Sequence, residues 1–497
     1  MGGEKYVIGI DASTQSTKAI AWTRDGHAVA EGRVAIRTDQ PHPSHAEQDA
    51  ETWWSSTREA LRAVLAKIDP ADVDAIAISD QRETMVFVDA AGRPLAPATL
   101  WIDGRAAESF RDFAEAFGAE RLHRITGKQP DVIPAVYRLH WFRRHNPDLL
   151  DRAAQILDVH GFLTMRLSGS PHATHTSADP LGIFDLQSKN WSIPILDSVD
   201  ISITKLPPVH APGTVMCCVS DPGAAETGLR PGTPIVAAGG DGQCAGLGAN
   251  AVRPGTVYLN LGTALVAGLW SPDPLTDRYW RTMTSPTGEG YFLEAVQRAG
   301  AFFVNWLIDN FAGGRADPNI FVRLEALASQ IPVGSEGLLV LPYLTGCMDP
   351  HWNPDARAAF IGLGAHHTTA HLYHASLEAL TLETARAVAA MRMAGLAAER
   401  IIAVGGGAAS ALWLRMFADA TGLPVYRGES DEGSALGAGI TAAFAVGWYE
   451  TIDSAAAAMS RTAQRISPDP STRDRWAALS SAQSKLYAAT MKALQRS

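Results

Sequence analysis

Short apolar segments alternate with amphipathic ones along most of the chain. Predominantly apolar runs of strand length occur at residues 6–10, 73–79, 234–238 and 400–404. Between them, residues 49–68 and 372–393 carry apolar side chains at the spacing of a helix with one buried face. Because helices and buried strands follow one another in this way, the pattern predicts an α/β fold whose mixed sheets are flanked by helices.

One hairpin pattern occurs twice, about half a chain apart. A strand, a small polar turn and a second strand are predicted around Thr14, and the same features return around Thr263. Hairpins of this kind are common, so a chance match is the alternative interpretation. The spacing favours a duplicated unit, and we expect two similar domains, at residues 1–244 and 245–497.

Composition and charge restrict the classes of partner. The chain has 497 residues, of which 46% are hydrophobic and 19% charged, as is typical of folded domains. Its formal net charge of −10 argues against nucleic-acid and anionic-membrane partners, which normally meet a basic surface. No segment has the roughly 18 apolar residues of a membrane span, and residues 1–5 do not resemble a signal peptide. We therefore expect a cytoplasmic protein.

A turn rich in serine and threonine follows the first apolar run. Residues 13–17 offer hydroxyl groups and successive backbone N–H groups, which can bind the phosphate oxygens of a nucleotide. Asp11, at the end of the preceding strand, is placed to hold Mg²⁺ through water. An ordinary hairpin turn is the alternative, but the second copy at Thr263 favours two hairpins that grip one polyphosphate.

A carboxylate lies among glycines after the strand at residues 234–238. Asp241 stands where ligands of α/β proteins usually bind, and it can accept a proton from a substrate hydroxyl. A turn aspartate is the simpler alternative. The glycine spacing at 240–245 and 246–251 also suggests a dinucleotide fingerprint, and hence an NAD-dependent oxidoreductase. No acidic residue stands at the offset that this fingerprint requires, so we regard the oxidoreductase as the weaker alternative.

Two charged runs follow the next apolar stretches. Arg82 and Glu83 come after residues 73–79, and Asp103 stands two residues after Trp101. Cationic and anionic side chains beside an aromatic wall suit a polyhydroxylated ligand, since each hydroxyl both donates and accepts hydrogen bonds. A salt-bridged surface turn is the alternative interpretation.

Together these segments resemble the FGGY carbohydrate kinase family of the actin and hexokinase superfamily. The resemblance covers nearly the whole chain in order, at residues 9–18, 45–49, 101–105, 206–208, 239–241, 262–263, 341–344, 356–357, 405–410 and 435–439. It implies two RNase H-like domains with a catalytic cleft between them. It also implies ATP-dependent phosphorylation of a small sugar or polyol, with ATP and Mg²⁺ as cofactors.

The resemblance also assigns roles to individual residues. It implies that Asp241 is the general base and that Asp11 holds Mg²⁺. The residues that it assigns to ATP are Thr14, Gln15, Ser16, Lys18, Thr263, Gly300, Gly406, Gly407 and Ser410. Those that it assigns to the sugar are Arg82, Glu83, Trp101, Asp103 and Asp241.

Within the family the spacing is most similar to xylulokinases, which implies a ketopentose such as D-xylulose. Where xylulokinases usually have Gln-Met-His, however, residues 81–84 read Gln-Arg-Glu-Thr, as in glycerol kinases. Gly242 and Ile133 differ in turn from the residues of glycerol kinases, and residues 346–348 replace a usual Gly-Glu-Arg. Glycerol, erythritol or another polyol is the alternative substrate, and an inactive sugar-sensing protein is the alternative without chemistry. The apolar and aromatic content is compatible with a homodimer.

Overall fold

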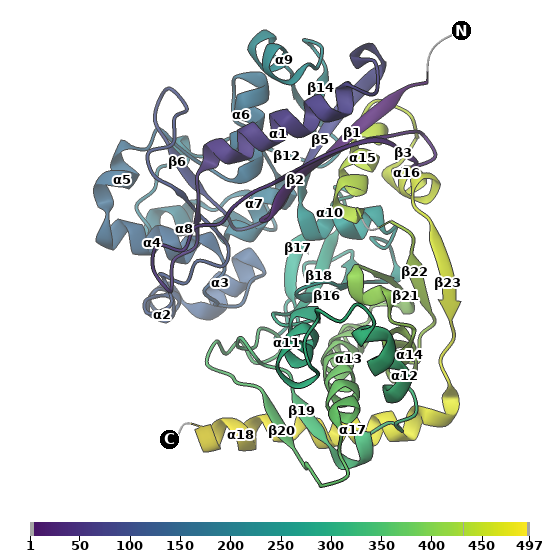
Figure 1. The fold of residues 1–497 in the computed structure, drawn as a ribbon. Helices are drawn as coiled ribbons and strands as arrows, with labels where there is room; N and C mark the ends of the chain where they lie inside the picture. Colours follow the sequence, from purple (N-terminus) through teal and green to yellow (C-terminus); the bar gives the residue numbers. More distant parts are fainter. Residues whose placement is uncertain (1–3, 431, 495–497) are drawn as a thin grey trace.

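Two mixed β-sheets, one in each half of the chain, form the framework of the protein (Figure 1). The structure, a computed structural model, describes residues 4–430 and 432–494. Residues 1–3, on which the expectation for the N-terminal segment partly rests, lie outside this part. In Figure 1 the first sheet lies in the upper half of the molecule and the second sheet in the lower half.

The first sheet has six strands in the spatial order β13-β14-β5-β1-β2-β3. Their bounds are β1 (Tyr6–Ala12), β2 (Ser16–Trp22), β3 (Ala28–Ala35), β5 (Val73–Asp80), β13 (Val215–Cys218) and β14 (Pro234–Gly240). Strands β1, β5 and β14 are parallel, whereas β2, β3 and β13 pair antiparallel with their neighbours. The three parallel strands are those with continuous apolar runs, because both of their faces are covered.

The second sheet repeats this arrangement and adds one edge strand, β17. Its strands are β15 (Gly255–Leu261), β16 (Leu265–Ser271), β17 (Arg281–Thr284), β18 (Tyr291–Gln297), β21 (Ala398–Val404), β22 (Val425–Gly428) and β23 (Thr462–Ile466). They lie in the order β17-β18-β16-β15-β21-β22-β23. Read from β23 to β18, the order and directions match those of the first sheet. The predicted α/β fold with two similar halves is therefore confirmed, and β1-β2 and β15-β16 are the repeated hairpins.

The two helices predicted from the sequence are present with slightly different ends. Helix α1 (Ala50–Leu65) begins after Asp49, whose carboxylate accepts a hydrogen bond from the N–H of Glu51. Helix α13 (Thr369–Met393) begins before residue 372, because Thr368 forms a capping box with the third helical residue. The remaining long helices include α2 (Phe110–Phe117), α4 (Ala135–His145), α6 (Val159–Ser168), α11 (Ala301–Phe311), α12 (Ile320–Ala328) and α17 (Arg473–Ser484).

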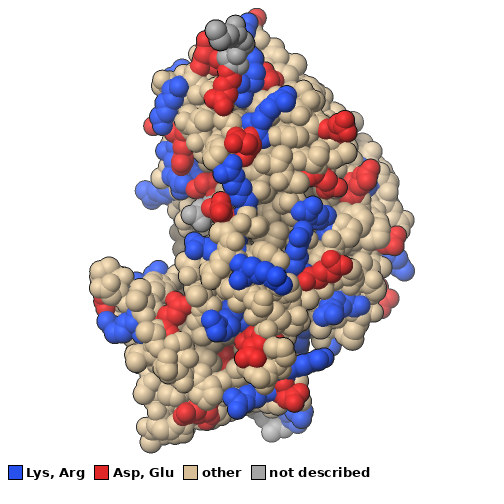
Figure 2. Space-filling view, turned by 90° about the vertical axis from the view of Figure 1, so that its right-hand side faces the viewer, with Lys and Arg blue, Asp and Glu red and all other residues tan. Residues whose placement is uncertain are grey.

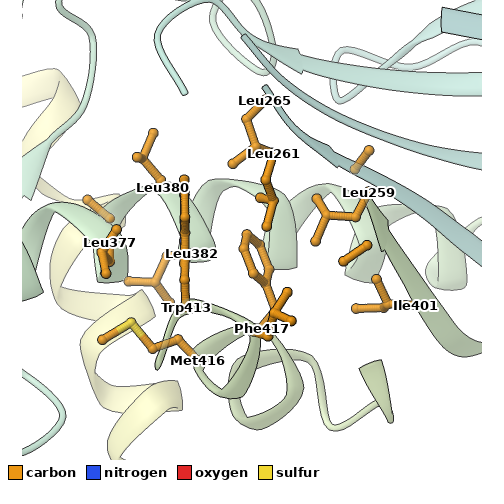
Figure 3. Packing of buried hydrophobic residues seen from close by; sticks show 14 of the residues in the cluster. Leu259, Leu261, Leu265, Leu377, Leu380, Leu382, Ile401, Trp413, Met416 and Phe417 are labelled. Carbon is orange, nitrogen blue, oxygen red and sulfur yellow. The ribbon is translucent and has the colours of Figure 1, made fainter. Parts of the chain in front are cut away.

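The core of the second half lies between its sheet and helices α13 and α14 (Ala411–Thr421). Figure 3 shows leucines of β15, β16 and α13 around Trp413, Met416 and Phe417 of α14. These side chains are almost completely buried, so their transfer from water stabilises this layer. The hairpin around Thr263 therefore stands on a well-packed support.

Two glycine-rich helices meet where the halves join. Helix α10 (Asp241–Gly248) follows β14, and α15 (Gly433–Ala445) packs against it (Figure 1). A Cβ atom at Gly248 would lie 2.1 Å from the carbonyl oxygen of Gly433, and one at Gly437 would lie 1.9 Å from that of Cys244. Gly248, one of the glycines in the suggested dinucleotide fingerprint, thus serves close helix packing, whereas Gly240 and Gly242 lie against the side chain of Arg82.

Charged side chains of both signs are interspersed on the face shown in Figure 2. That face therefore has no broad basic patch of the kind that nucleic-acid binding uses. Among residues 4–430 and 432–494, no helix combines the length and the apolar character needed to cross a bilayer.

Candidate active site

Three aspartates stand at the carboxyl ends of the three parallel strands of the first sheet. Asp11 is the last residue but one of β1, Asp80 ends β5, and Asp241 is the first residue of α10 after β14. Asp80 pairs in register with Ala12 on one side and with Gly240 on the other. The three residues therefore share one edge of the sheet, the edge at which α/β proteins usually bind ligands.

A cavity of about 450 Å³ lies beside Asp241, between residues of the two halves. Arg82, Glu83 and Trp101 line it from the first half, and Thr263 lines it from the second. Five residues predicted from the sequence thus meet in one cavity. Its volume is in the range of about 300–1,000 Å³ that is typical of small-molecule sites.

The carboxylate of Asp241 is accessible from the cavity, with 38% of its side chain exposed. One oxygen accepts a hydrogen bond from the N–H of Gly242 at 2.7 Å and lies 3.2 Å from Nε of Arg82. Burial raises the pKa of Asp241, while the charge of Arg82 opposes that rise. A carboxylate with a raised pKa is a stronger base, which suits it to accept a hydroxyl proton.

Glu83 is held in a strained backbone conformation beside the cavity. Its φ of 57° lies in the left-handed region, which non-glycine residues seldom adopt. The buried guanidinium of Arg138 donates hydrogen bonds to the carbonyl oxygens of Glu83 and Ile133 and so fixes this turn. Such strain is often retained at ligand-binding sites because it fixes the direction of a side chain.

Arg82 and Glu83 are paired with two buried charges of the second half. Glu294 on β18 accepts from Nη1 of Arg82 at 2.9 Å and lies 2.6 Å from Nη2 of Arg281 on β17. Nη1 of Arg281 in turn donates to Glu83 at 2.7 Å. Although burial alone would raise it, the two arginines lower the pKa of Glu294 to about 2. The four side chains therefore form a charged chain across the junction of the halves.

The surroundings of Asp11 fit the predicted role in holding Mg²⁺. Burial, and then the charge of Asp241, raise the pKa of Asp11 to about 7, so a cation beside it would relieve an unfavourable charge. Its one side-chain hydrogen bond in the described residues comes from Ser79, at 3.3 Å. No group of three His, Cys, Asp or Glu in the described part of the chain is arranged to hold a metal ion. Mg²⁺ at Asp11 would therefore take most ligands from water and phosphate, as it often does.

We expect Asp11→Asn to raise the thermal midpoint of the nucleotide-free protein. The pKa of an aspartate in the unfolded chain is about 3.9, so ionisation of Asp11 in the folded state costs increasing stability as pH rises towards 7. The gain should therefore be larger at pH 8 than at pH 5, by at least roughly 2 °C. Thermal unfolding of the variant and of the wild-type chain at both pH values measures the gain, and a gain at pH 8 that is equal to or smaller than the gain at pH 5 would contradict the raised pKa.

The predicted phosphate residues of the first hairpin do not line the cavity, although Thr14 contacts Trp101, which does. The hydroxyl of Thr14 donates to Gln81 at 3.0 Å and accepts from Nε1 of Trp101 at 3.0 Å. Gln15 lies at the tip of the turn, and Ser16 begins β2. Lys18 forms an ion pair with Glu432 at 2.5 Å, so binding of Lys18 to a phosphate would compete with that carboxylate.

The predicted nucleotide residues of the second half surround the second hairpin. The N–H of Gly300 donates to the carbonyl oxygen of Thr263 at 2.9 Å, at the start of α11. Gly406 and Gly407 form a 3-10 turn after β21, and Gly407 packs against Leu261. Ser410 caps α14 and donates to Glu325 at 3.0 Å. None of these four residues lines the cavity that holds Asp241.

Asp103 does not line the cavity, in contrast to the other residues assigned to the sugar. Its carboxylate is buried and accepts hydrogen bonds from the N–H of Ala46 at 2.8 Å and from Nε of Arg105 at 2.7 Å. Arg105 also pairs with Glu47 at 2.5 Å. Asp103 thus supports the loop that carries Trp101, because the arginine two residues later occupies its oxygens.

Sequence reasoning missed three charged residues of the second half at the site. Arg281 and Arg298 line the cavity, and Glu294 lies directly behind it. Arg298 pairs with Asp131 at 2.6 Å. The available signal was a charge inside an apolar strand, since Glu294 interrupts the run Phe-Leu-Glu-Ala-Val at residues 292–296.

Comparison with known proteins gives matches over most of the chain. The N-terminal domain of the FGGY family of carbohydrate kinases matches residues 6–248, and the C-terminal domain of that family matches residues 257–446. The chain is 28% identical to a xylulose kinase of Bacillus subtilis, covering 93% of each chain. It is 28% identical to an autoinducer-2 kinase of an Enterobacter strain, covering 94% of this chain and 91% of that one.

A solved structure has nearly the same arrangement throughout. The crystal structure of xylulose kinase from Rhodospirillum rubrum superposes with a TM-score of 0.92 at 29% identity, covering 98% of this chain and 99% of that chain. The similarity therefore extends to both sheets and to their relative placement.

Proposed function

Since the chain belongs to the FGGY family of carbohydrate kinases and transfers phosphate from ATP to a sugar, we propose that its substrate is a small uncharged ketopentose such as D-xylulose. The observation that carries the proposal is the cavity in which Asp241, Arg82, Glu83 and Thr263 meet. The substrate hydroxyls would bind at Arg82 and Glu83, and the transferred phosphate would lie towards Thr263.

The charges of the cavity favour an uncharged substrate. Its three arginines already have carboxylate partners: Arg82 pairs with Asp241 and Glu294, Arg281 with Glu83 and Glu294, and Arg298 with Asp131. A sugar acid or sugar phosphate would have to displace one of these carboxylates, at the cost of leaving it unpaired. Hydroxyl groups can instead bind the same side chains without breaking an ion pair.

In the proposed mechanism Asp241 accepts the proton of the attacking sugar hydroxyl. The sugar oxygen forms a bond to the γ-phosphorus, and the bond from that phosphorus to the oxygen of ADP breaks. Mg²⁺ held at Asp11 would supply positive charge to the phosphate oxygens. Lys18 and the backbone around Thr263, on the two hairpins, would orient the phosphates and stabilise their charge.

A polyol is the second candidate substrate. Arg82 and Glu83 are the pair that resembles glycerol kinases, and both line the cavity. A coupled assay of ADP release with D-xylulose, L-xylulose, D- and L-ribulose, glycerol, erythritol and autoinducer-2 separates the candidates. Strong stimulation by a ketopentose supports the proposal, stimulation by glycerol or erythritol alone replaces it with a polyol kinase, and silence across the panel contradicts both.

We expect ATP hydrolysis without sugar to be at least about tenfold slower than ADP release with sugar. The site is made from both halves, so it excludes water only when they are closed on a substrate. Measurement of ADP release with and without saturating sugar tests this expectation. Equal rates would show that closure does not depend on the sugar.

A further inference from the structure

Five charged side chains of alternating sign run from the proposed base across the junction of the halves. In order they are Asp241, Arg82, Glu294, Arg281 and Glu83. The first two and the last belong to the first half, whereas the third and fourth stand on β18 and β17 of the second half. The second half of the protein thus supplies Glu294 and Arg281 to this row of charged side chains, and the side chains at its two ends are proposed to contact the sugar.

Glu294 is the residue on which both arginines converge. Its side chain is completely buried, and each of its oxygens has a guanidinium partner within 3.2 Å. Arg281 stands directly opposite Glu294 in the register between β17 and β18, so the sheet itself sets their distance. The edge strand β17 that carries Arg281 adjoins the first half of the molecule in Figure 1.

Buried charges of this kind are not an efficient source of stability. Moving charged groups out of water costs free energy that pairing only partly offsets. Well-packed apolar side chains in the same place would stabilise the fold equally well. The arrangement instead fixes direction, because two guanidinium groups that share one carboxylate have few alternative positions. Arg82 and Glu83 have carboxylate and guanidinium partners that keep them aimed at the cavity.

We infer that Glu294, together with Arg281, is a positioning residue through which the second half of the protein sets sugar affinity and choice. The inference rests on the proposed function. Because Glu294 and Arg281 can hold Arg82 and Glu83 only when the halves are together, the sugar site is complete only in the closed arrangement.

The test compares sugar kinetics in Glu294→Gln and Arg281→Lys with the wild-type chain. We expect each substitution to raise the KM for the sugar at least about tenfold and to leave the KM for ATP within about twofold. The ratio of kcat/KM between two sugars should also shift, which a loss of general stability would not produce. Arg281→Lys retains the positive charge, so it carries the test if Glu294→Gln does not fold.

Thr284→Val is the matched control. Thr284 ends the same strand as Arg281 and donates across the same junction to Asp179, at 3.2 Å, and it is not a hydrogen-bond partner of Arg82 or Glu83. We expect its KM for the sugar to stay within about twofold of the wild-type value. An equal rise in this control, or unchanged KM and sugar ratio in both test variants, would overturn the inference. A wild-type chain that no sugar stimulates would contradict the proposed function itself.

Discussion

Asp241→Asn is expected to lower turnover with sugar by at least about 10²-fold while leaving the KM for ATP within about twofold. The asparagine can keep the hydrogen bond from Gly242 but cannot accept the proton of the attacking hydroxyl. Steady-state ADP release with saturating sugar measures the effect. Near-normal turnover would remove Asp241 from the mechanism.

Asp80→Asn is the matched control for that substitution. Asp80 lies on the neighbouring strand at the same edge of the sheet but does not line the cavity. Burial, and then the nearby charge of Asp158, raise its pKa well above the usual value, and asparagine has nearly the same size and shape as aspartate. We expect turnover within about threefold of wild type, whereas a loss as large as that of Asp241→Asn would mean that any change at this edge disables the enzyme.

Arg82→Gln is expected to raise the KM for the sugar roughly 10- to 100-fold, with the KM for ATP within about twofold. Hydrogen bonds from a guanidinium to a sugar hydroxyl are charge-assisted and therefore strong, and Arg82 also orients Asp241. Initial rates across a matrix of sugar and ATP concentrations separate the two constants. A defect confined to ATP would place Arg82 on the nucleotide side.

Arg105→Gln is the control for Arg82→Gln, because it also removes an arginine that pairs with two carboxylates. Arg105 pairs with Asp103 and Glu47 but does not line the cavity. The substitution should lower the thermal midpoint and leave the KM for the sugar within about threefold. A large rise in that KM would indicate that Asp103 and Arg105 contribute to sugar binding.

The repeated architecture could be predicted because its signals are local. Apolar runs of strand length and the two hairpins around Thr14 and Thr263 can each be identified within about ten residues. The positions of Asp11 and Asp241 follow from the same reasoning, since a residue at the end of a parallel strand must lie at the ligand-binding edge.

The electrostatic partners could not be predicted because they depend on contacts between distant segments. Glu294 reaches Arg82, and Glu432 reaches Lys18, only because the two halves fold against each other. Asp103 is the opposite case, because its carboxylate pairs with the nearby Arg105 instead of lining the cavity. Residue type and spacing identified the candidates, but only the packed structure shows which charges are already paired.

The most direct test of the account measures the product of the reaction rather than ADP alone. The wild-type chain is incubated with ATP, Mg²⁺ and D-xylulose, and mass spectrometry counts sugar phosphate against ADP, with Asp241→Asn in parallel. The account predicts one sugar phosphate for each ADP and almost none from the variant. ADP that accumulates with inorganic phosphate and without sugar phosphate would contradict it.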